Sequence, residues 1–412
     1  MPKQQEIIPH LFRSEYRKIV AVLTSLFGFD QIEIAEDIAA DTFLIAIETW
    51  GLRGLPENPT AWLYNVAKNN AKNYLKKNTL FLRKIRVELQ STSSESQEIA
   101  IDLSAQNITD SQMQMMFAIC HPSLSKEAQI CMALRVLCGF GIEEIAGAFL
   151  CSKETINKRL FRAKEKLRSE NIKMELPAQN QINERLNTVL ITIYLLFNEG
   201  YYSISQEFNL RKDFCLEAIR LCNLLVENAA TDKPAVNALL SLMCFHASRF
   251  DARINSSGAF VLYENQEVSL WNTELMEKGE YFLSRAATGD AVSKYHLEAA
   301  IAYWHTHKKD TAEKWENILQ LYNLLLKIEY SPVAALNRIY ALSKANGKIE
   351  AIAEAKKIAL INSFYYFVLM GELHIVVDKI KAKEYFEQAL LLSKTTCDKS
   401  VIQNKIALLI CQ

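Results

Sequence analysis

Residues 141–167 read GIEEIAGAFLCSKETINKRLFRAKEKL and predict two helices that are joined by a short turn. The first helix covers 141–149, where the small residue Ala146 lets a second helix cross closely. Ser152 is a favoured N-cap residue and is expected to begin the second, longer helix. Its buried residues recur at three- and four-residue spacing and are Ile156, Leu160, Ala163 and Leu167. This stretch predicts a helix-turn-helix motif.

The polar face of the second helix is basic. In a helix-turn-helix motif, such a face lies in the major groove of duplex DNA, where it meets phosphates and base edges. Its members are Thr155, Lys158, Arg159, Arg162 and Lys166. The alternative is an ordinary corner of two helices with a solvated basic face. Leu150 favours this alternative, because most such motifs have glycine at that place in the turn.

The N-terminal part of the chain separates its charges. Residues 19–52 contain six acidic residues and no basic one, whereas residues 58–87 contain seven basic residues and no acidic one. Glu33, Asp37 and Asp41 form one stripe of a helix, where like charges repel by roughly a few tenths of a kcal/mol per pair. A basic partner would relieve this repulsion, and a solvated acidic face is the alternative. The apolar residues expected to face inward are Ile34, Ile38, Phe43, Leu44 and Ile47.

The basic segment predicts a helix that begins at Pro59-Thr60 and continues through Lys77. Lysines supply contacts to phosphates, and asparagine amides can bond to base edges. The stripe that combines them contains Lys68, Asn69, Lys72, Asn73 and Lys76. Aromatic rings can cover unstacked bases, although packing in the core is the alternative for each of them. Those of this helix are Trp62, Tyr64 and Tyr74.

Composition predicts an all-α protein of the cytoplasm. Only 12 glycines and 8 prolines interrupt 412 residues, and apolar residues recur at three and four almost everywhere. The 47 basic and 47 acidic residues balance, so only the distribution of charge can indicate DNA binding. The nine cysteines are expected to be reduced, buried thiols. Neither a signal-peptide pattern nor an apolar run of about 20 residues is found, so we expect no membrane partner.

Changes in composition divide the chain into four parts. A helical block at 8–80 is followed by a polar linker at 81–109, which contains the serine-rich stretch 91–96. A second helical block at 110–172 holds the helix-turn-helix motif. A series of amphipathic helices then fills 181–412.

The C-terminal series shows a weak repeat. Ala382, Phe386 and Ala389 have the spacing of a tetratricopeptide helix, and Ala351 with Ala355 repeats part of it. From residue 351 to residue 382 the offset is 31 residues, whereas regular repeats of this type need about 34. The residues therefore predict a helical array, either generic or tetratricopeptide-like.

A polar motif ends a very apolar segment of this series, with the sequence Phe197-Asn198-Glu199-Gly200-Tyr201. Its amide and carboxylate need partners if they are buried. One interpretation is a helix end near Gly200 whose polar groups bond to a neighbouring helix. The other is a contact with the preceding domains or with a small effector.

No group of residues indicates catalysis or a cofactor. His305 and His307 are two residues apart, so their side chains diverge on a helix, and Cys120-His121 lacks neighbouring ligands. No phosphate-binding loop, dinucleotide-binding fingerprint or nucleophile elbow is present. We therefore expect no enzyme activity, no cofactor and no metal.

The N-terminal helices resemble those of bacterial RNA polymerase sigma factors of the extracytoplasmic-function type. Residues 35–43, AEDIAADTF, are similar to that family's AEDxxQDxF helix, and residues 61–69, AWLYNVAKN, to its AWLxxxAxN helix. The resemblance implies a sigma region 2 helical bundle, a sigma region 4 helix-turn-helix domain and non-enzymatic, promoter-specific transcription initiation. It implies docking on the clamp of core RNA polymerase through Glu33, Glu36, Asp37, Asp41 and Phe43.

The resemblance also assigns two sets of residues to promoter DNA. Those expected at the melted minus-ten element are Trp62, Lys68, Asn69, Lys72, Asn73 and Lys76. Those expected at the minus-thirty-five element are Lys153, Thr155, Lys158, Arg159, Arg162 and Lys166.

Beyond residue 180 the chain resembles the subgroup of these factors that has a tetratricopeptide-like C-terminal extension. The similar segments are 117–124, 194–201, 294–301 and 331–337. The resemblance implies that the extension regulates the factor, with a possible intramolecular contact to the sigma domains. A DNA-binding regulator with a helical-repeat sensor is the alternative, and a helical-repeat scaffold is the third interpretation.

Overall fold

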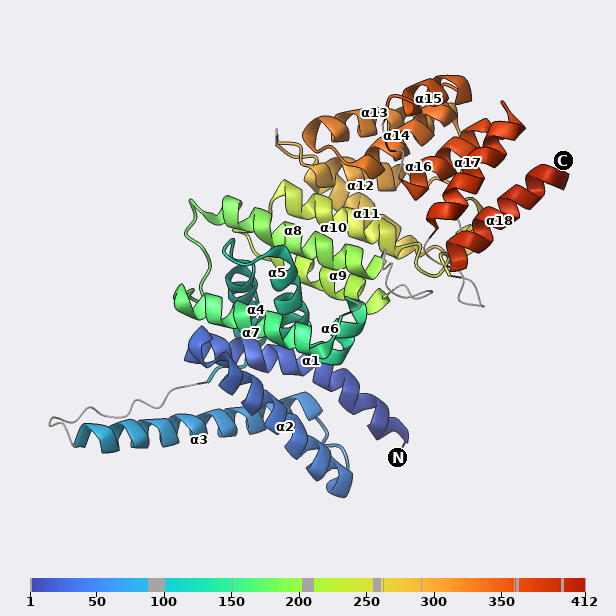
Figure 1. The fold of residues 1–412 in the computed structure, drawn as a ribbon. Helices are drawn as coiled ribbons and strands as arrows, with labels where there is room; N and C mark the ends of the chain where they lie inside the picture. Colours follow the sequence, from blue (N-terminus) through green and yellow to red (C-terminus); the bar gives the residue numbers. More distant parts are fainter. Residues whose placement is uncertain are drawn as a thin grey trace. The chain divides into compact units, whose positions relative to one another are not determined.

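The computed structural model is all-helical in the part of the chain that it describes, which confirms the predicted fold class (Figure 1). The described residues are 2–87, 101–149, 151–201, 211–254, 261, 263–289, 291–358, 360, 363–393 and 396–411. They form two compact units, Met1–Leu196 and Phe197–Gln412. Within the described ranges, no helix is both long and apolar enough to cross a bilayer.

The first three helices form what we call the N-terminal bundle. They are α1 (Pro2–Phe27), α2 (Ile32–Arg53) and α3 (Pro59–Val87), with the short 3-10 helix η1 (Phe29–Gln31) between α1 and α2. Gly28 has a φ of +89°, a conformation open to glycine, and it turns the chain sharply after α1. Ala35, Ala39 and Ala46 are fully buried, so α2 can lie close to its neighbours.

The next helices form the second bundle, which contains the predicted helix-turn-helix motif. They are α4 (Ala105–Ile119), α5 (Lys126–Met132), η2 (Ala133–Leu137, a π-helix), α6 (Ile142–Ala148) and α7 (Lys153–Ser169). Ser152 caps α7 by accepting a hydrogen bond from the Thr155 backbone N–H, as predicted. All four members of the predicted buried stripe are buried. Leu150, in the predicted turn, lies outside the described residues.

Helices cover both ends of the segment 81–109 that is predicted to be a linker. Helix α3 continues through Val87, past the expected end of the first block at residue 80, and α4 begins at Ala105. Residues 88–100, which include the serine-rich stretch, lie outside the described residues.

The remaining helices follow one another along the chain, and from α9 onward they pack mainly against their sequence neighbours. They are α8 (Ile182–Tyr201), α9 (Lys212–Val226), α10 (Pro234–Ala247), α11 (Thr273–Ala286), α12 (Lys294–Trp304), α13 (Ala312–Ile328), α14 (Pro332–Ala345), α15 (Lys348–Ala355), α16 (Phe364–His374), α17 (Lys379–Leu392) and α18 (Thr396–Cys411). Two 3-10 helices, η3 (Tyr263–Asn265) and η4 (Val268–Leu270), precede α11. This arrangement is the helical array that the sequence predicts.

In two hairpins of this array, a glycine of one helix packs against a phenylalanine ring of the other helix. Gly279 of α11 lies under the ring of Phe245 in α10, and Gly371 of α16 lies under the ring of Phe386 in α17. A Cβ atom on either glycine would come within 2.6 Å of a ring carbon. The close approach of the two helices therefore requires glycine at both places.

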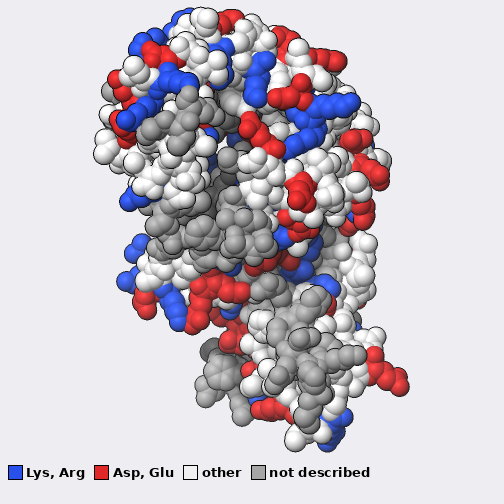
Figure 2. All heavy atoms as spheres, turned by 90° about the vertical axis from the view of Figure 1, so that its right-hand side faces the viewer, with Lys and Arg blue, Asp and Glu red and all other residues white. Residues whose placement is uncertain are grey.

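The distribution of charge on the surface agrees with the balanced composition. On the face in Figure 2, described Lys and Arg side chains are interspersed with Asp and Glu side chains, as expected of a neutral chain.

Six of the seven cysteines with described side chains are buried free thiols, which confirms the prediction of reduced, buried thiols for these six, and Cys151 is partly exposed. Burial raises the pKa of Cys120 to about 12, so this thiol is not a nucleophile at neutral pH.

Candidate nucleic-acid and protein interfaces

The outward face of α7 is basic and accessible. Beside the N-terminal end of α5 it lines an open hollow, which contains Ser123, Leu124, Ser125, Ala128, Thr155, Lys158, Arg159, Arg162, Ala163 and Lys166. Lys158 and Arg162 are exposed and have no ion-pair partner among the described residues. Their charges are therefore available to phosphates.

The other basic residues predicted for this face are less free. Lys153 is paired with Glu143 of α6, and Lys166 Nζ lies 2.8 Å from Glu170 Oε1. The Arg159 guanidinium is half-buried, 3.5 Å from Cys131 Sγ and 5.9 Å from the centre of the Phe149 ring. Arg159 therefore also holds α7 on the second bundle.

The predicted stripe of α3 lies on one accessible face. Asn69, Asn73 and Lys76 are exposed, and Lys68 and Lys72 are partly exposed. The opposite side of the helix is buried through Leu63, Ala67 and Ala71. The structure thus brings all five lysines and asparagines together as the spacing predicts.

The three aromatic residues of α3 differ in their surroundings. The Tyr64 hydroxyl donates a 2.6 Å hydrogen bond to Glu15 of α1, and the Tyr74 hydroxyl donates a 2.9 Å bond to Gln31 of η1. Burial, together with Glu15, raises the pKa of Tyr64 well above its usual value. Both tyrosines therefore hold α3 on the bundle, which is the structural alternative. Trp62 is half-buried, with its ring centre 5.3 Å from that of Trp50.

The exposed side of α2 combines carboxylates with apolar groups. Asp37 and Asp41 are exposed, as expected of docking residues. Leu44 and Ile47 are 55% and 50% exposed, so the prediction that they face inward is wrong. Exposed apolar side chains that lie together with polar residues around them are typical of a surface that binds another protein.

Phe43 belongs to the core of the N-terminal bundle. It is 2% exposed, and its ring centre lies 4.9 Å from that of Phe12. The structure therefore gives Phe43 a supporting position behind the acidic surface. The Phe43 ring is therefore not exposed on the acidic surface of α2.

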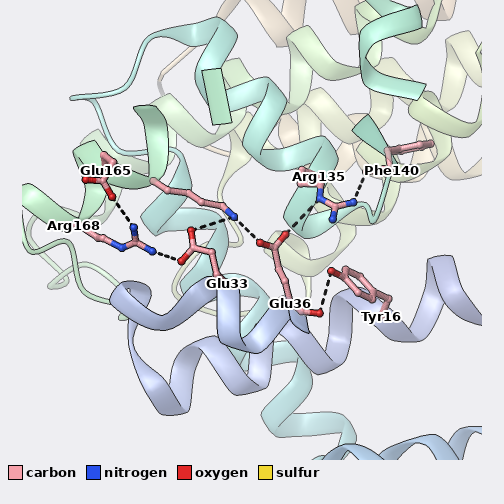
Figure 3. A network of polar contacts seen from close by, with 8 residues as sticks. Tyr16, Glu33, Glu36, Arg135, Phe140, Glu165 and Arg168 are labelled. Carbon is pink, nitrogen blue, oxygen red and sulfur yellow. Dashed lines mark hydrogen bonds and ion pairs between the residues drawn. The ribbon is translucent and has the colours of Figure 1, made fainter. Parts of the chain in front are cut away.

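Glu33 and Glu36, the other two acidic docking residues, face the second bundle (Figure 3). Lys164 Nζ of α7 lies 2.5 Å from Glu36 Oε2 and 3.5 Å from Glu33 Oε1. Arg168 of α7 donates to Glu33, and Arg135 Nε lies 3.4 Å from Glu36 Oε1. We call these five residues the interbundle network.

Local structure explains how the cations of the network are placed. Lys164 and Arg168 are four residues apart on α7, so they share a face that is distinct from the DNA-facing one. Arg135 comes from η2, and its Nη1 also donates to the Phe140 carbonyl at 3.3 Å. Sequence reasoning missed the three cations as partners of α2. The four-residue spacing on α7 could have indicated Lys164 and Arg168, whereas no local pattern indicates Arg135.

Helix α8 is anchored on the second bundle through its N-terminal part. The buried Thr192 hydroxyl donates a 3.1 Å hydrogen bond to Gln129 Oε1 of α5. Arg185 donates a 2.6 Å bond to the Phe117 carbonyl of α4. The apolar residues of this part are buried and include Leu186, Val189, Leu190 and Ile193.

The motif at 197–201 forms the last turn of α8. Helix α8 is described through Tyr201, and residues 202–210 lie outside the described residues, so the helix end that one interpretation predicts near Gly200 stays a prediction. A Cβ atom on Gly200 would lie 2.7 Å from Cys215 Sγ and 2.8 Å from the Arg211 carbonyl oxygen, so glycine lets α9 approach closely. Burial raises the pKa of Glu199. Within the described ranges, no cluster of His, Cys, Asp or Glu is arranged to hold a metal ion.

Comparisons with known proteins match three parts of the chain. The family models named Sigma-70 region 2 and Sigma-70, region 4 match residues 11–80 and 116–167. A family of unknown function (DUF6596) matches residues 185–287. An uncharacterized protein of Rhizobium meliloti (strain 1021) is 30% identical over 383 residues, which are 92% of this chain and 90% of the relative. No solved structure matches the chain.

Proposed function

The chain belongs to the same family as the uncharacterized Rhizobium meliloti protein, and because the Sigma-70 region 2 and Sigma-70, region 4 models match its two bundles, we propose that it is a sigma factor that directs promoter-specific transcription initiation. It would bind core RNA polymerase and promoter DNA without making or breaking a covalent bond. The N-terminal bundle corresponds to the region 2 match, and the second bundle to the region 4 match.

One observation carries this proposal: the chain has two separate basic helix faces next to an acidic and apolar one. The α7 face suits duplex DNA, because its free cations lie on a capped helix of a helix-turn-helix motif. The α3 face suits a single strand, because amides lie between lysines and Trp62 lies on the same helix. A conventional DNA-binding regulator needs only the first of these faces.

The differences between the α3, α7 and α2 surfaces support the assignment of each surface to one part of the transcription complex. In the proposed complex, α3 engages the melted minus-ten strand, and α7 reads the minus-thirty-five duplex. The exposed side of α2, with Asp37, Asp41, Leu44 and Ile47, binds the polymerase clamp. We assign the factor to the extracytoplasmic-function type on the strength of its sequence motifs.

We propose that the helices after α8 form a tetratricopeptide-like regulatory extension. Its last hairpin supports this assignment, because Ala382, Phe386 and Ala389 are fully buried against the preceding helix layer. Helix α8 provides a route by which the extension can act, since its N-terminal part is bonded to α4 and α5.

Run-off transcription with purified core polymerase tests the proposal. Transcripts that start at one promoter and require this chain are the expected result. Binding to duplex DNA without activation of core polymerase would instead support the conventional regulator.

A charge-reversal variant tests the docking surface. Replacing Asp37 and Asp41 by Lys should abolish co-purification with core polymerase, because the new charges would repel a basic partner. Binding of duplex DNA should persist, since α7 is unchanged. The matched control is Glu48→Lys, which reverses a charge on α2 outside the proposed docking set. Retained co-purification of the double variant would refute the docking assignment.

A further inference from the structure

The interbundle network occupies part of the surface that polymerase would need. The Glu36 and Lys164 side chains are only 12% and 13% exposed, so each screens the other from solvent. Glu33 is engaged by Lys164 and Arg168 together. Two of the four carboxylates assigned to the docking surface are therefore already bound to cations of this chain.

Further contacts join the same two bundles. Helix α1 packs against α4, and the Ser25 hydroxyl of α1 donates a 3.1 Å hydrogen bond to Gln114 Oε1 of α4. Arg135 also lies 5.9 Å from the centre of the Tyr16 ring of α1. The contact between the bundles is thus an extended interface with the network at one side of it.

This closed arrangement is too short for the proposed promoter. Elements near minus ten and minus thirty-five are about 25 base pairs apart, which is ~85 Å at a rise of 3.4 Å per base pair. A compact unit of 196 residues has a radius of gyration of about 16 Å and hence a diameter of roughly 40 Å. The two bundles must separate before both elements can be bound at once.

We propose that the interbundle network holds the free protein in an autoinhibited closed state, in which Arg135, Lys164 and Arg168 compete with core polymerase for the acidic surface of α2. This regulation rests on the proposed function. It also explains why α7 carries cations on two faces: one face binds DNA, and the other binds α2. The closed protein keeps Lys158 and Arg162 exposed, so it should still bind duplex DNA.

The test measures opening and polymerase affinity separately. Spin labels are carried by non-natural amino acids at the exposed positions Leu52 and Ser169, which leaves the native cysteines untouched. In the full-length protein, electron-spin distance measurements should show one short population. The triple variant Arg135→Ala, Lys164→Ala, Arg168→Ala should shift it to a broad, long one. Core polymerase should shift the wild-type protein in the same way.

The same triple variant should bind core polymerase about tenfold more tightly if nine-tenths of the wild-type protein is closed, because the apparent dissociation constant scales inversely with the competent fraction. Its affinity for duplex DNA should not change. The matched control is Lys309→Ala, which removes one cation at an exposed position between α12 and α13, outside both bundles. It should leave both the distance and the affinity unchanged.

The outcomes separate the two proposals. Unchanged distances in the triple variant, or opened distances with unchanged polymerase affinity, would overturn the autoinhibition. A triple variant that opens in the distance measurement, while neither it nor the wild type binds polymerase, would leave the closed state standing and refute the proposed function. Thermal unfolding of the triple variant shows whether each bundle remains folded.

Discussion

Helices α3 and α7 are both basic and amphipathic, yet their charges are used differently. Helix α3 places its lysines and asparagines on one side and buries the other, and no acidic residue interrupts it. Helix α7 contains Glu154 and Glu165, and its cations point both to the DNA-facing hollow and to α2. The number of lysines on a helix therefore does not tell which of them are available to a ligand.

The largest effect is expected from the removal of a buried leucine from each helix. Leu160→Ala in α7 and Leu63→Ala in α3 should each lower the free energy of unfolding by about 2–5 kcal/mol, because both side chains are buried. Thermal unfolding measures this loss. Leu160→Ala should impair duplex binding and interbundle closure together, whereas Leu63→Ala should impair single-strand binding alone. Equal effects of both variants on both DNA forms would contradict the division of labour.

The next test removes the exposed cations. Lys158→Ala with Arg162→Ala should reduce the slope of log affinity against log salt for the minus-thirty-five duplex by about 2, if each side chain meets one phosphate. The matched pair Lys68→Ala with Lys76→Ala should leave the duplex slope unchanged and reduce the single-strand slope by a similar amount. Fluorescence anisotropy at several salt concentrations measures both slopes. A loss on the wrong nucleic acid would show that the two faces are misassigned.

The aromatic residues of α3 are expected to have two different roles. Trp62→Ala should weaken single-strand binding by about 1–3 kcal/mol if the ring stacks on a base. Tyr74→Phe should instead lower the free energy of unfolding by about 1 kcal/mol, since it leaves Gln31 without its donor, with strand affinity unchanged. Titration with a minus-ten oligonucleotide and chemical unfolding separate the two effects. An unaffected Trp62→Ala protein would assign that ring to packing.

The smallest expected effect concerns an ion pair on the surface of α7. Lys166 and Glu170 are four residues apart, and such a solvent-exposed pair contributes little to stability. Glu170→Gln should therefore barely change unfolding, while it frees Lys166 for phosphate and slightly strengthens duplex binding. Parallel unfolding and anisotropy measurements check this. Weaker duplex binding by Glu170→Gln would mean that the pair positions Lys166.

Local patterns predicted the elements of the two bundles well. Ser152 and the buried stripe that begins at Ile156 follow from capping and period alone, so α7 is where the sequence places it. The inward direction of Leu44 and Ile47 was wrong because α2 has apolar residues on more than one side. When two sides of a helix are apolar, the periodicity of its sequence does not tell which side is buried in the bundle.

Contacts between distant residues could not be predicted. Glu36 and Lys164 are separated by 128 residues, and each has several candidate partners of opposite charge. The hydroxyls of Tyr64 and Tyr74 likewise find acceptors in α1 and η1, which no local pattern indicates. Gly371 under Phe386 is a similar case, since the sequence shows a glycine but not the ring above it.

The buried bond between Thr192 and Gln129 has a consequence for any deletion experiment. Gln129 also donates to the His121 and Leu124 carbonyls, so its amide ties together the loop before α5. A protein shortened to residue 180 would lose Thr192 and expose the apolar side of α5 and its neighbours to water. Such a fragment would misfold or aggregate for reasons unrelated to regulation. A deletion that avoids this keeps the bond of Thr192 and ends at Leu196, the last residue of the first compact unit.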